Sequence, residues 1–378
     1  MTVPTKKIRV LHILRTADIG GIERSVLDLS QSQNQSNHTT AEALFAWSAT
    51  GEYSENFKEA EIPCHSLGLK NGYSGSLSLF RKLRKLYRQF DIIHFHLFNP
   101  FMAFSAMGLG IPLVFTDHGF SIIRGPLKIR HRLLRSIFRG FARVALARII
   151  YNSKFTLEAA SQSFPYALKI GCIVLNGISG MKKEPDSPLS PSFNGCSRNK
   201  ETCFVVGTAT RFVPFKRVDY LIRAFAQFQD GKNCKLLLVG GGVLQPEYEQ
   251  LVQELGIEGV TEFTGYQRDV SFYQNKMDVA VIPSQAESFG LAILETLALG
   301  KPTLIFSDGG GLVEAVEQQF PNDVVDSVEA LTARLEQLFD QRKSIANDVA
   351  ARKAFVAGFS IDKMTANLHQ VYREVLTL

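Results

Sequence analysis

Short strand-like segments alternate with helix-like segments along the chain, and this alternation limits the fold more than any other feature. IRVLHILRT, DIIHFHLF, LVFTDHG, RIIYNS and KIGCIVLN are rich in β-branched residues and have the length of buried strands. Each is followed by a helical or irregular crossover. Such alternation predicts a parallel sheet covered by helices on both faces.

The alternation stops once and then begins again. The stretch ISGMKKEPDSPLSPSFNGCSRNKE is rich in serine, proline, glycine and charge, which is typical of a linker. A second series follows it: TCFVVGTATRF, KLLLVGGG, VTEFTG, DVAVIPS and KPTLIFSDGG. We therefore predict an α/β protein with two doubly wound, Rossmann-like domains and a shared ligand in the cleft between them.

Length and composition agree with two domains. The 378 residues exceed one ordinary domain, and 45% hydrophobic with 21% charged residues is typical of a globular protein. We predict a first domain over 1–178, a linker over 179–200 and a second domain over 201–355. The last helix, within 356–378, could pack on either domain and so cross back to the first.

Three properties of the whole chain bear on its location and partners. No apolar run approaches the roughly 18 residues that span a membrane. The five cysteines are odd in number and contain no CxxC pair, which favours a reducing, cytoplasmic compartment. The formal net charge of +6 suggests an anionic partner.

Two loops that follow strands carry groups suited to phosphates. Gly20 and Gly21 follow the first strand and would let an anion approach backbone amides, although GxGxxG is absent and a plain tight turn is an equal interpretation. In the second half, Arg211 and Lys216 lie between a strand and a helix. A guanidinium fork and an ammonium suit a diphosphate, while solvated loop charges are the alternative.

Two carboxylates flank the segment AESFGLAILETLALGKP. Glu287 follows a buried strand, Ser288 is the predicted N-cap of the next helix, and Glu295 lies inside that helix. If all residues between them are helical, the carboxylates stand about 12 Å apart along the axis, on the order of the span from a ribose to a sugar across a diphosphate. The helix start also offers amides to a phosphate at Phe289, Gly290 and Leu291.

This pattern describes a nucleotide-sugar site, because carboxylates accept hydrogen bonds from sugar hydroxyls. The alternative makes Glu287 a capping residue and Glu295 a surface residue.

These motifs, in this order, resemble the GT-B fold glycosyltransferases of the large retaining family 4. The resemblance covers nearly the whole chain through GGIER, DIIHFHLFNP, TDHGF, VLNGI, RFVPFKR, LLLVGGG, EFTGYQRDV and ESFGLAILETLALGKP, the last matching the E-x7-E motif of the family. Two positions depart from the pattern. VLNGISG lacks an aspartate that often follows Asn-Gly, and Gly241 stands where an aspartate is common.

The resemblance implies a role for each candidate residue. Glu287 would contact the donor sugar, Glu295 the ribose hydroxyls, and His118 would lie beside the donor sugar, which makes His118 and Glu287 the catalytic candidates. The donor diphosphate would bind to Arg211, Lys216, Gly20 and Gly21. The two glycines would also approach the acceptor. The base would be flanked by Tyr266, Gln267 and Arg268.

Neither a metal nor another cofactor is expected. The chain has no DxD motif, so cations and a helix N-terminus would neutralise the leaving diphosphate. His94 and His96 share one face of a strand, but no cysteine or carboxylate cluster accompanies them, and we expect one to line the cleft without assigning either as a ligand. The resemblance implies retention of configuration by front-face attack. A double displacement would need a nucleophile, for which Glu287 is the obvious candidate.

A basic helix is predicted in the first domain, because residues 124–148 contain no acidic residue. On a helical projection one face carries Arg132, Arg135, Arg139 and Arg143, and the opposite face Leu134, Phe138, Phe141 and Ala145. Its arginines could simply be solvated, or they could bind anionic lipid headgroups or a lipid diphosphate acceptor. No recognised motif supports nucleic acid as the partner.

Three functions remain in view. The first is a retaining, metal-independent glycosyltransferase that moves a hexose from a UDP- or GDP-sugar to a glycolipid, lipid-linked oligosaccharide or polysaccharide, in the cytoplasm or at the cytoplasmic face of the inner membrane. Lipopolysaccharide or capsule synthesis would be its setting. The second is a nucleotide-sugar epimerase of similar fold, and the third a non-catalytic nucleotide-sugar binding partner in a membrane assembly.

Overall fold

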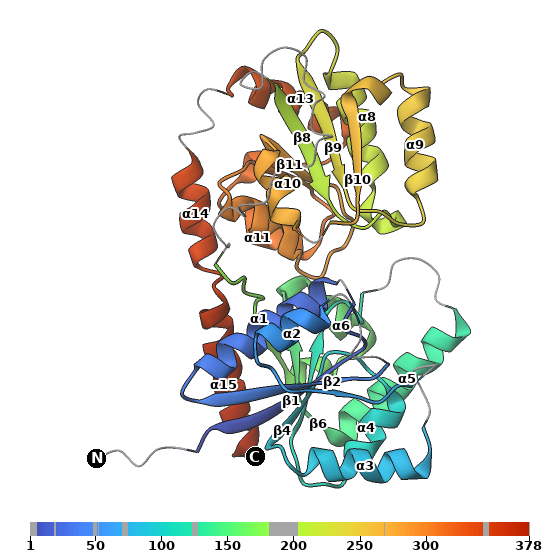
Figure 1. Cartoon of the computed structure of the whole chain (residues 1–378), viewed down its shortest axis with the longest axis vertical. Coiled ribbons are helices and arrows are strands. Elements are labelled where there is room, and N and C mark those ends of the chain that lie inside the picture. The colour runs from blue at the N-terminus through green and yellow to red at the C-terminus, as the bar shows by residue number, and fades with distance from the viewer. Residues whose placement is uncertain are drawn as a thin grey trace. The chain divides into compact units, whose positions relative to one another are not determined.

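The computed structural model describes residues 6–18, 20–47, 51, 53–69, 75–122, 128–180, 203–267, 269–342 and 348–377 (Figure 1). The chain divides into two compact units. The first comprises Met1–Ser179 with Phe359–Leu378, and the second Gly180–Gly358. Each unit has one parallel sheet, so the predicted α/β class is confirmed. The predicted linker lies outside the described residues except for 179 and 180.

The first unit contains a seven-stranded sheet in the order β3-β2-β1-β4-β5-β6-β7. All neighbouring strands are parallel. The strands are β1 (Ile8–Leu14), β2 (Thr39–Phe45), β3 (Cys64–Ser66), β4 (Ile92–Phe95), β5 (Leu113–Asp117), β6 (Leu146–Tyr151) and β7 (Gly171–Ile173). The helices are α1 (Gly21–Gln35), α2 (Ser54–Glu59), α3 (Leu77–Tyr87), α4 (Pro100–Ala106), α5 (Ile129–Ala145), α6 (Lys154–Ser163), α7 (Ala167–Ile170) and α15 (Ile361–Leu376).

Successive side chains of each strand point to opposite faces of this sheet, as strand geometry requires. Leu11 and Ile13 of β1 belong to an aromatic-rich core that also holds residues of α3, α4 and α5. Val10, on the opposite face, packs with residues of α15 that include Leu368 and Tyr372. The last helix of the chain is therefore part of the first unit and packs on one face of its sheet (Figure 1).

The second unit contains a six-stranded parallel sheet in the order β10-β9-β8-β11-β12-β13. The strands are β8 (Phe204–Ala209), β9 (Cys234–Val239), β10 (Thr261–Gly265), β11 (Val279–Ile282), β12 (Thr303–Phe306) and β13 (Val324–Val325). The α-helices are α8 (Val218–Phe228), α9 (Gln245–Glu254), α10 (Val270–Lys276), α11 (Leu291–Ala298), α12 (Gly311–Val316), α13 (Val328–Asp340) and α14 (Val349–Ala357), and the 3₁₀ turns are η1 (Pro214–Lys216), η2 (Glu258–Val260) and η3 (Pro321–Asp323).

In both units the strand order reverses direction beside the first strand. The reversal lies between β1 and β4 in the first unit and between β8 and β11 in the second. Doubly wound sheets bind ligands outside the carboxyl ends of the strands at such a reversal. The segments that follow these strands are therefore where candidate site residues are expected.

Two findings bear on the predicted location. None of the helices built from the described residues is both long and apolar enough to cross a membrane. Cys64, Cys172 and Cys234 are free thiols, whereas Cys203 is disulfide-bonded.

Candidate functional site

In the second unit, a glycine-rich turn holds the loop that carries Arg211. Gly240 and Gly242 have φ angles of 121° and 157°, and a Cβ on either would collide with the carbonyl oxygen of Thr210 or Phe212. The amide of Phe212 donates to the carbonyl oxygen of Gly241 at 2.8 Å, and the Phe212 ring is fully buried. The residues on both sides of Arg211 are thus fixed while Arg211 itself is exposed.

Lys216 and Glu287 form an ion pair at the carboxyl ends of the central strands. Lys216 ends η1, which follows β8, and Glu287 lies in the loop after β11. The Lys216 ammonium donates to Glu287 Oε1, and the two side chains are 16% and 12% exposed. The sequence placed these residues in separate roles, whereas the structure joins the proposed diphosphate cation to the proposed sugar carboxylate.

Backbone bonds hold Glu287 in place. Its amide donates to the Gly309 carbonyl oxygen at 2.9 Å, and the Gly311 amide donates to the Glu287 carbonyl oxygen at the same distance. The preceding residue, Ala286, has a φ of 51°, a conformation that side chains rarely adopt. A carboxylate on such a fixed turn is preorganised to meet a ligand.

Arg217 supports this site, and the sequence analysis did not single it out. Its guanidinium makes a bidentate pair with Asp308, at 2.8 and 2.5 Å, and its Nε donates to the Pro283 carbonyl oxygen at 2.8 Å. These bonds tie η1 to the ends of β11 and β12. The RFVPFKR motif contains Arg217, but its letters do not reveal which cation is structural.

The helix that carries Glu295 starts later than predicted. Its N-cap is Gly290 and its first residue is Leu291, so the assignment of Ser288 as the N-cap is wrong. Gly290 enters the helix with a φ of 83°, and a Cβ there would strike Leu312. Phe289 and Gly290 therefore precede the helix, and Leu291 opens its first turn. The Phe289 side chain is buried, at 2% exposure.

Glu295 lies in the second turn of α11 and is partly exposed. Gln274, a buried residue of α10, donates from Nε2 to Glu295 Oε2 at 3.4 Å. This bond positions the carboxylate from a neighbouring helix. Glu295 is therefore more constrained than the surface residue of the alternative interpretation.

The predicted base-flanking segment is only partly described. The Tyr266 ring is 62% exposed and lies over Gly241, where a Cβ would stand 3.1 Å from it. A side chain at Gly241 would therefore require the Tyr266 ring to shift. Gln267 donates from Nε2 to the Thr264 carbonyl oxygen at 2.6 Å, and Arg268 lies outside the described residues.

In the first unit, the turn at Gly20 already faces a carboxylate. Gly20 is the N-cap of α1, and the Glu23 carboxylate lies where a Cβ of Gly20 would be. Gly21 begins the helix and has open space around its Cβ position. An anion that approached Gly20 would first have to displace Glu23.

His118 directly follows β5 and is the outer end of a chain of imidazoles. Its Nε2 lies 2.9 Å from His96 Nδ1, and His96 Nε2 lies 2.9 Å from His12 Nδ1. His12 Nε2 in turn lies 2.8 Å from Gln33 Oε1. Burial lowers the pKa of His12 and of His118 to about 4. Of this chain, the sequence motif HFHLF contains only His96, and its links to His12 and His118 join residues that lie far apart in the sequence.

The turn that carries His118 is fixed by Asp117. Its carboxylate accepts from the Gly119 amide at 2.8 Å and from the Ser121 hydroxyl at 2.5 Å. Burial raises the pKa of Asp117, while these hydrogen bonds oppose the rise.

Three of the buried histidines meet the spacing of a metal site. The possible ligand atoms of His12, His94 and His96 all lie within 4.8 Å of one another. His94 binds the Tyr372 hydroxyl through Nδ1 and the Thr116 hydroxyl through Nε2, both at 2.7 Å. Every ring nitrogen of the three therefore has a protein partner, and a metal would have to break those bonds.

The basic helix α5 differs from its predicted projection. Arg135 points inward and donates to the carbonyl oxygens of Phe120, Ser121 and Ile122. Burial lowers the pKa of Arg135. The prediction of one solvated arginine face is thus wrong for Arg135, because the carbonyl groups of the turn after β5 need donors.

The outer face of α5 combines cations with apolar side chains. Arg132 and Arg143 are exposed, Arg139 is partly exposed, and Arg143 also lies over the Phe164 ring at 4.9 Å. The apolar face packs in the core, as predicted, through Phe138 and Phe141 with the partly buried Leu134 and Ala145. Three further apolar residues are exposed: Ile129 at 85%, Leu133 at 61% and Val144 at 73%.

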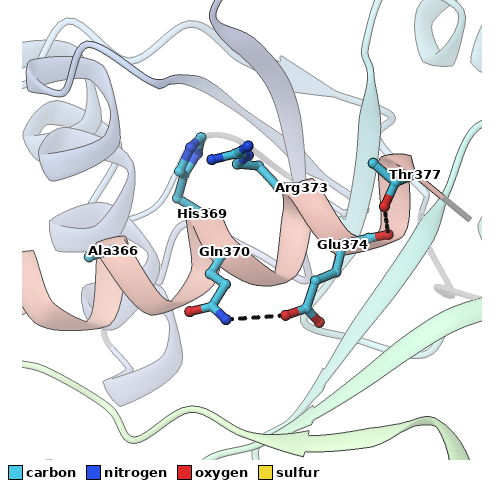
Figure 2. A pocket seen from close by; sticks show the side chains of 6 residues that line it. All are labelled: Ala366, His369, Gln370, Arg373, Glu374 and Thr377. Atoms are coloured by element: carbon cyan, nitrogen blue, oxygen red, sulfur yellow. Dashed lines mark hydrogen bonds between the residues drawn. The ribbon is translucent and has the colours of Figure 1, made fainter.

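A shallow depression of about 500 Å³ lies on the outer surface of α15, away from the predicted site residues (Figure 2). Gln370 donates to Glu374 at 3.2 Å within it. Its lining comprises Ala366, His369, Gln370, Arg373, Glu374 and Thr377. These polar side chains come from a single helix and converge on no common point.

Comparison with known proteins identifies the family. The model described as "Glycosyltransferase Family 4" matches residues 19–179, and the model described as "Glycosyl transferases group 1" matches residues 196–353. The chain is 31% identical over 173 residues to N-acetyl-alpha-D-glucosaminyl L-malate synthase of Bacillus anthracis, a match that covers 44% of each protein. It is 27% identical over 259 residues to the Vi polysaccharide biosynthesis protein VipC/TviE of Salmonella typhi, covering 65% of this chain and 43% of that protein.

The chain thus aligns with less than half the length of either relative. Among solved structures, that of Anabaena HepE in complex with UDP and glucose is similar over 97% of this chain and 100% of that one, with a TM-score of 0.78 and 20% sequence identity. Since the two family models together match most of both units, the chain belongs to the family 4 glycosyltransferases and has the GT-B fold.

Proposed function

We propose that the protein is a retaining hexosyltransferase that uses a nucleoside diphosphate sugar without a metal. The observation that carries this proposal is the Lys216–Glu287 pair at the carboxyl ends of β8 and β11, with the exposed Arg211 in the same loop as Lys216. Two cations can neutralise a diphosphate, and a carboxylate next to them can hold sugar hydroxyls. The structural neighbour bound to UDP and glucose favours UDP and a hexose over other donors.

Three groups would act on the donor. Lys216 would exchange its bond to Glu287 for one to the diphosphate, and Arg211 would add a bidentate contact. Glu287, released from Lys216, would accept hydrogen bonds from the sugar. This arrangement stabilises the charge that develops on the leaving diphosphate.

The acceptor hydroxyl would attack from the same face from which the diphosphate leaves. A phosphate oxygen of the leaving group would take the proton of that hydroxyl, so no protein nucleophile is required. In this proposal Glu287 binds sugar hydroxyls and does not attack the anomeric carbon.

Product analysis tests this proposal. Purified protein is incubated with UDP-glucose and candidate acceptors, and the anomeric configuration of the product is determined by NMR. We expect acceptor-dependent release of UDP and an α-linked product. Modified free nucleotide sugar without an acceptor would instead identify an epimerase, and binding without any turnover a non-catalytic partner.

We propose an acceptor at an anionic membrane surface, on the cytoplasmic side. The outer face of α5 supports this, because exposed Ile129, Leu133 and Val144 lie among exposed cations that include Arg130 and Arg132. Apolar side chains flanked by arginines are typical of interfacial helices. The relative named for Vi polysaccharide synthesis favours a polysaccharide or its lipid-linked precursor as the acceptor.

Vesicle co-sedimentation tests the membrane contact with a matched pair of valines. Val144 and Val243 are 73% and 74% exposed, and Val243 lies in the second unit. We expect Val144→Ser, and Arg130→Gln with Arg132→Gln, to weaken binding to anionic vesicles, while Val243→Ser binds like wild type. Binding that ignores lipid charge, or equal behaviour of both valine variants, would leave a soluble acceptor as the better proposal.

A further inference from the structure

The imidazole chain that ends at His118 has a direction, and Gln33 determines it. All four members lie in the first unit: Gln33 on α1, His12 on β1, His96 after β4 and His118 after β5. Each link is a close contact between one ring nitrogen and the next polar atom, at 2.8 to 2.9 Å. In such a chain the donor and acceptor roles of one link decide those of the next.

The rings are neutral at neutral pH. Burial lowers the pKa of His12 and of His118 to about 4, and burial together with neighbouring histidines lowers that of His96 well below its ordinary value. A neutral imidazole carries one N–H and one lone pair. Each ring can therefore donate at one nitrogen only and must accept at the other.

The Gln33 amide presents its oxygen to the chain. Gln33 Oε1 lies 2.8 Å from His12 Nε2, whereas Gln33 Nε2 is buried and has no hydrogen-bond partner among the described residues. An amide oxygen can only accept a hydrogen bond, so this end of the chain is an acceptor.

The acceptor at Gln33 then determines which nitrogen of each imidazole donates and which accepts, from His12 outward to His118. Gln33 Oε1 can only accept, so His12 donates from Nε2 and accepts at Nδ1. His96 consequently donates from Nε2 to His12 and accepts at Nδ1. His118 donates from Nε2 to His96, which leaves Nδ1 of His118 with a lone pair. For that Nδ1 no protein partner is recorded within the described part of the chain.

We propose that Gln33, His12 and His96 are positioning residues that fix His118 as the Nε2–H tautomer, so that its Nδ1 accepts a hydrogen bond from a substrate hydroxyl. This inference rests on the proposed function for the identity of the substrate as a sugar. An imidazole lone pair attracts a hydroxyl proton but repels a carboxylate or phosphate oxygen. The chain therefore selects a neutral hexose over a sugar acid at this position.

Two other interpretations of the cluster are weaker. A metal held by His12, His94 and His96 would take one ring nitrogen from each, and each of those nitrogens already has a protein partner that the metal would have to displace. A proton relay is also disfavoured, because the inner end is an amide oxygen that cannot carry a proton onward. Fixing a tautomer requires neither.

Histidine NMR tests the proposal without any substrate. Long-range proton–nitrogen correlation spectra of protein labelled with nitrogen-15 histidine distinguish Nε2–H, Nδ1–H and averaged imidazoles. Single histidine replacements assign the eight side chains. We expect His118 to be the neutral Nε2–H tautomer at pH 7. An Nδ1–H tautomer, an average of the two, or shifts of His12, His94 and His96 on adding Zn²⁺ would overturn the proposal.

Two variants and a matched control test how the tautomer is fixed. Gln33→Met removes the terminal acceptor while keeping the length of the side chain, and His96→Leu cuts the chain beside His118. His94→Leu is the packing control, since His94 is also buried and its ring packs against His96 and His12, but its nitrogens bond to Thr116 and Tyr372 instead. We expect mixed tautomers at His118 in the first two and the wild-type spectrum of His118 in the control. An equal change in all three would indicate a packing effect and overturn the proposal.

Activity separates this inference from the proposed function. With an active donor, His96→Leu should lower kcat on the order of 10-fold, the effect of one misplaced hydrogen bond, and His94→Leu much less. The expected tautomer without transfer of any sugar would refute the proposed function and leave the chain standing. Transfer of sugar by a protein whose His118 is the Nδ1–H tautomer would refute the chain and leave the proposed function standing.

Discussion

At the scale of single residues, the contact between Lys216 and Glu287 would affect how strongly a diphosphate binds to Lys216. The two side chains are close and mostly buried, so each compensates the charge of the other. A diphosphate that binds Lys216 has to compete with the Glu287 carboxylate. The two glutamates of the motif therefore differ in what their loss does to nucleotide affinity.

Glu295→Ala is expected to weaken UDP binding by about 1.5 to 3 kcal/mol, because it would remove the proposed charge-assisted hydrogen bond to the ribose. Glu287→Ala should leave UDP affinity unchanged or higher, since it frees Lys216, while turnover falls. Isothermal titration with UDP and steady-state kinetics measure the two effects. Wild-type-like behaviour of both variants, or weaker UDP binding in Glu287→Ala alone, would contradict the assignment.

The sequence predicted which residues gather here but not how they pair. Arg211, Lys216 and Glu287 were each singled out from their places after strands, and the sheet order brings these strand ends together. The pairing of Lys216 with Glu287 spans 71 residues and depends on the conformation of two loops. Likewise, Arg135 was predicted on the solvated face because a helical projection does not show the carbonyl groups of a distant turn.

At the scale of elements, the loops after β8 and β9 hold each other in place. Gly240 and Gly242 allow the β9 loop to approach the carbonyl groups of Thr210 and Phe212. No other residue type fits, because both the φ angles and the space exclude a Cβ. The exposure of Arg211 is thus a consequence of glycines some thirty residues later in the chain.

Gly240→Ala is expected to displace Thr210 and to lower both stability and UDP affinity. Strain at its φ of 121° and the clash with the Thr210 carbonyl together should cost on the order of 1 to 3 kcal/mol of unfolding free energy. Gly231→Ala is the control, because Gly231 also has a positive φ of 65° but open space around its Cβ position. Urea unfolding and UDP titration should show a loss of affinity for Gly240→Ala only; equal losses would contradict the coupling.

Elements with a strong pattern were predicted, and those with a weak pattern were not. The buried strands β1, β4 and β5 read directly as apolar runs. The strand β2 was missed because its sequence, TTAEALF, contains Glu42 and resembles a helix former as much as a strand. The start of α11 was misplaced because Ser288 is a good capping residue, while the left-handed Gly290 and its contact with Leu312 depend on tertiary structure.

At the scale of the whole molecule, buried histidines link the stability of the first unit to pH. His12 and His118 titrate near pH 4 in the folded chain and near the ordinary 6.5 in the unfolded chain, because burial lowers their pKa. Between these values the unfolded chain binds more protons, so stability is full above about pH 6.5 and falls as the pH drops. His94 and His96 act in the same direction, whereas Asp117, whose pKa is raised, opposes them.

We therefore expect the free energy of unfolding to fall by on the order of 2 to 4 kcal/mol between pH 7 and pH 5. Urea unfolding followed by tryptophan fluorescence measures this, since Trp47 is the only tryptophan of the chain and lies in the first unit. His94→Leu should show a shallower dependence. Stability that is flat or rises toward pH 5 would contradict neutral, buried histidines.

We propose that protein cations, rather than a metal, bind the diphosphate of a nucleotide sugar. A thermal-shift screen of UDP, GDP and their sugars in excess EDTA tests it most directly, because a ligand that binds the folded state raises its melting temperature. We expect at least one nucleoside diphosphate to stabilise wild type in EDTA, and Lys216→Ala and Arg211→Ala to lose most of the shift in melting temperature. Stabilisation that appears only with Mg²⁺ or Mn²⁺, or that persists fully in both variants, would contradict it.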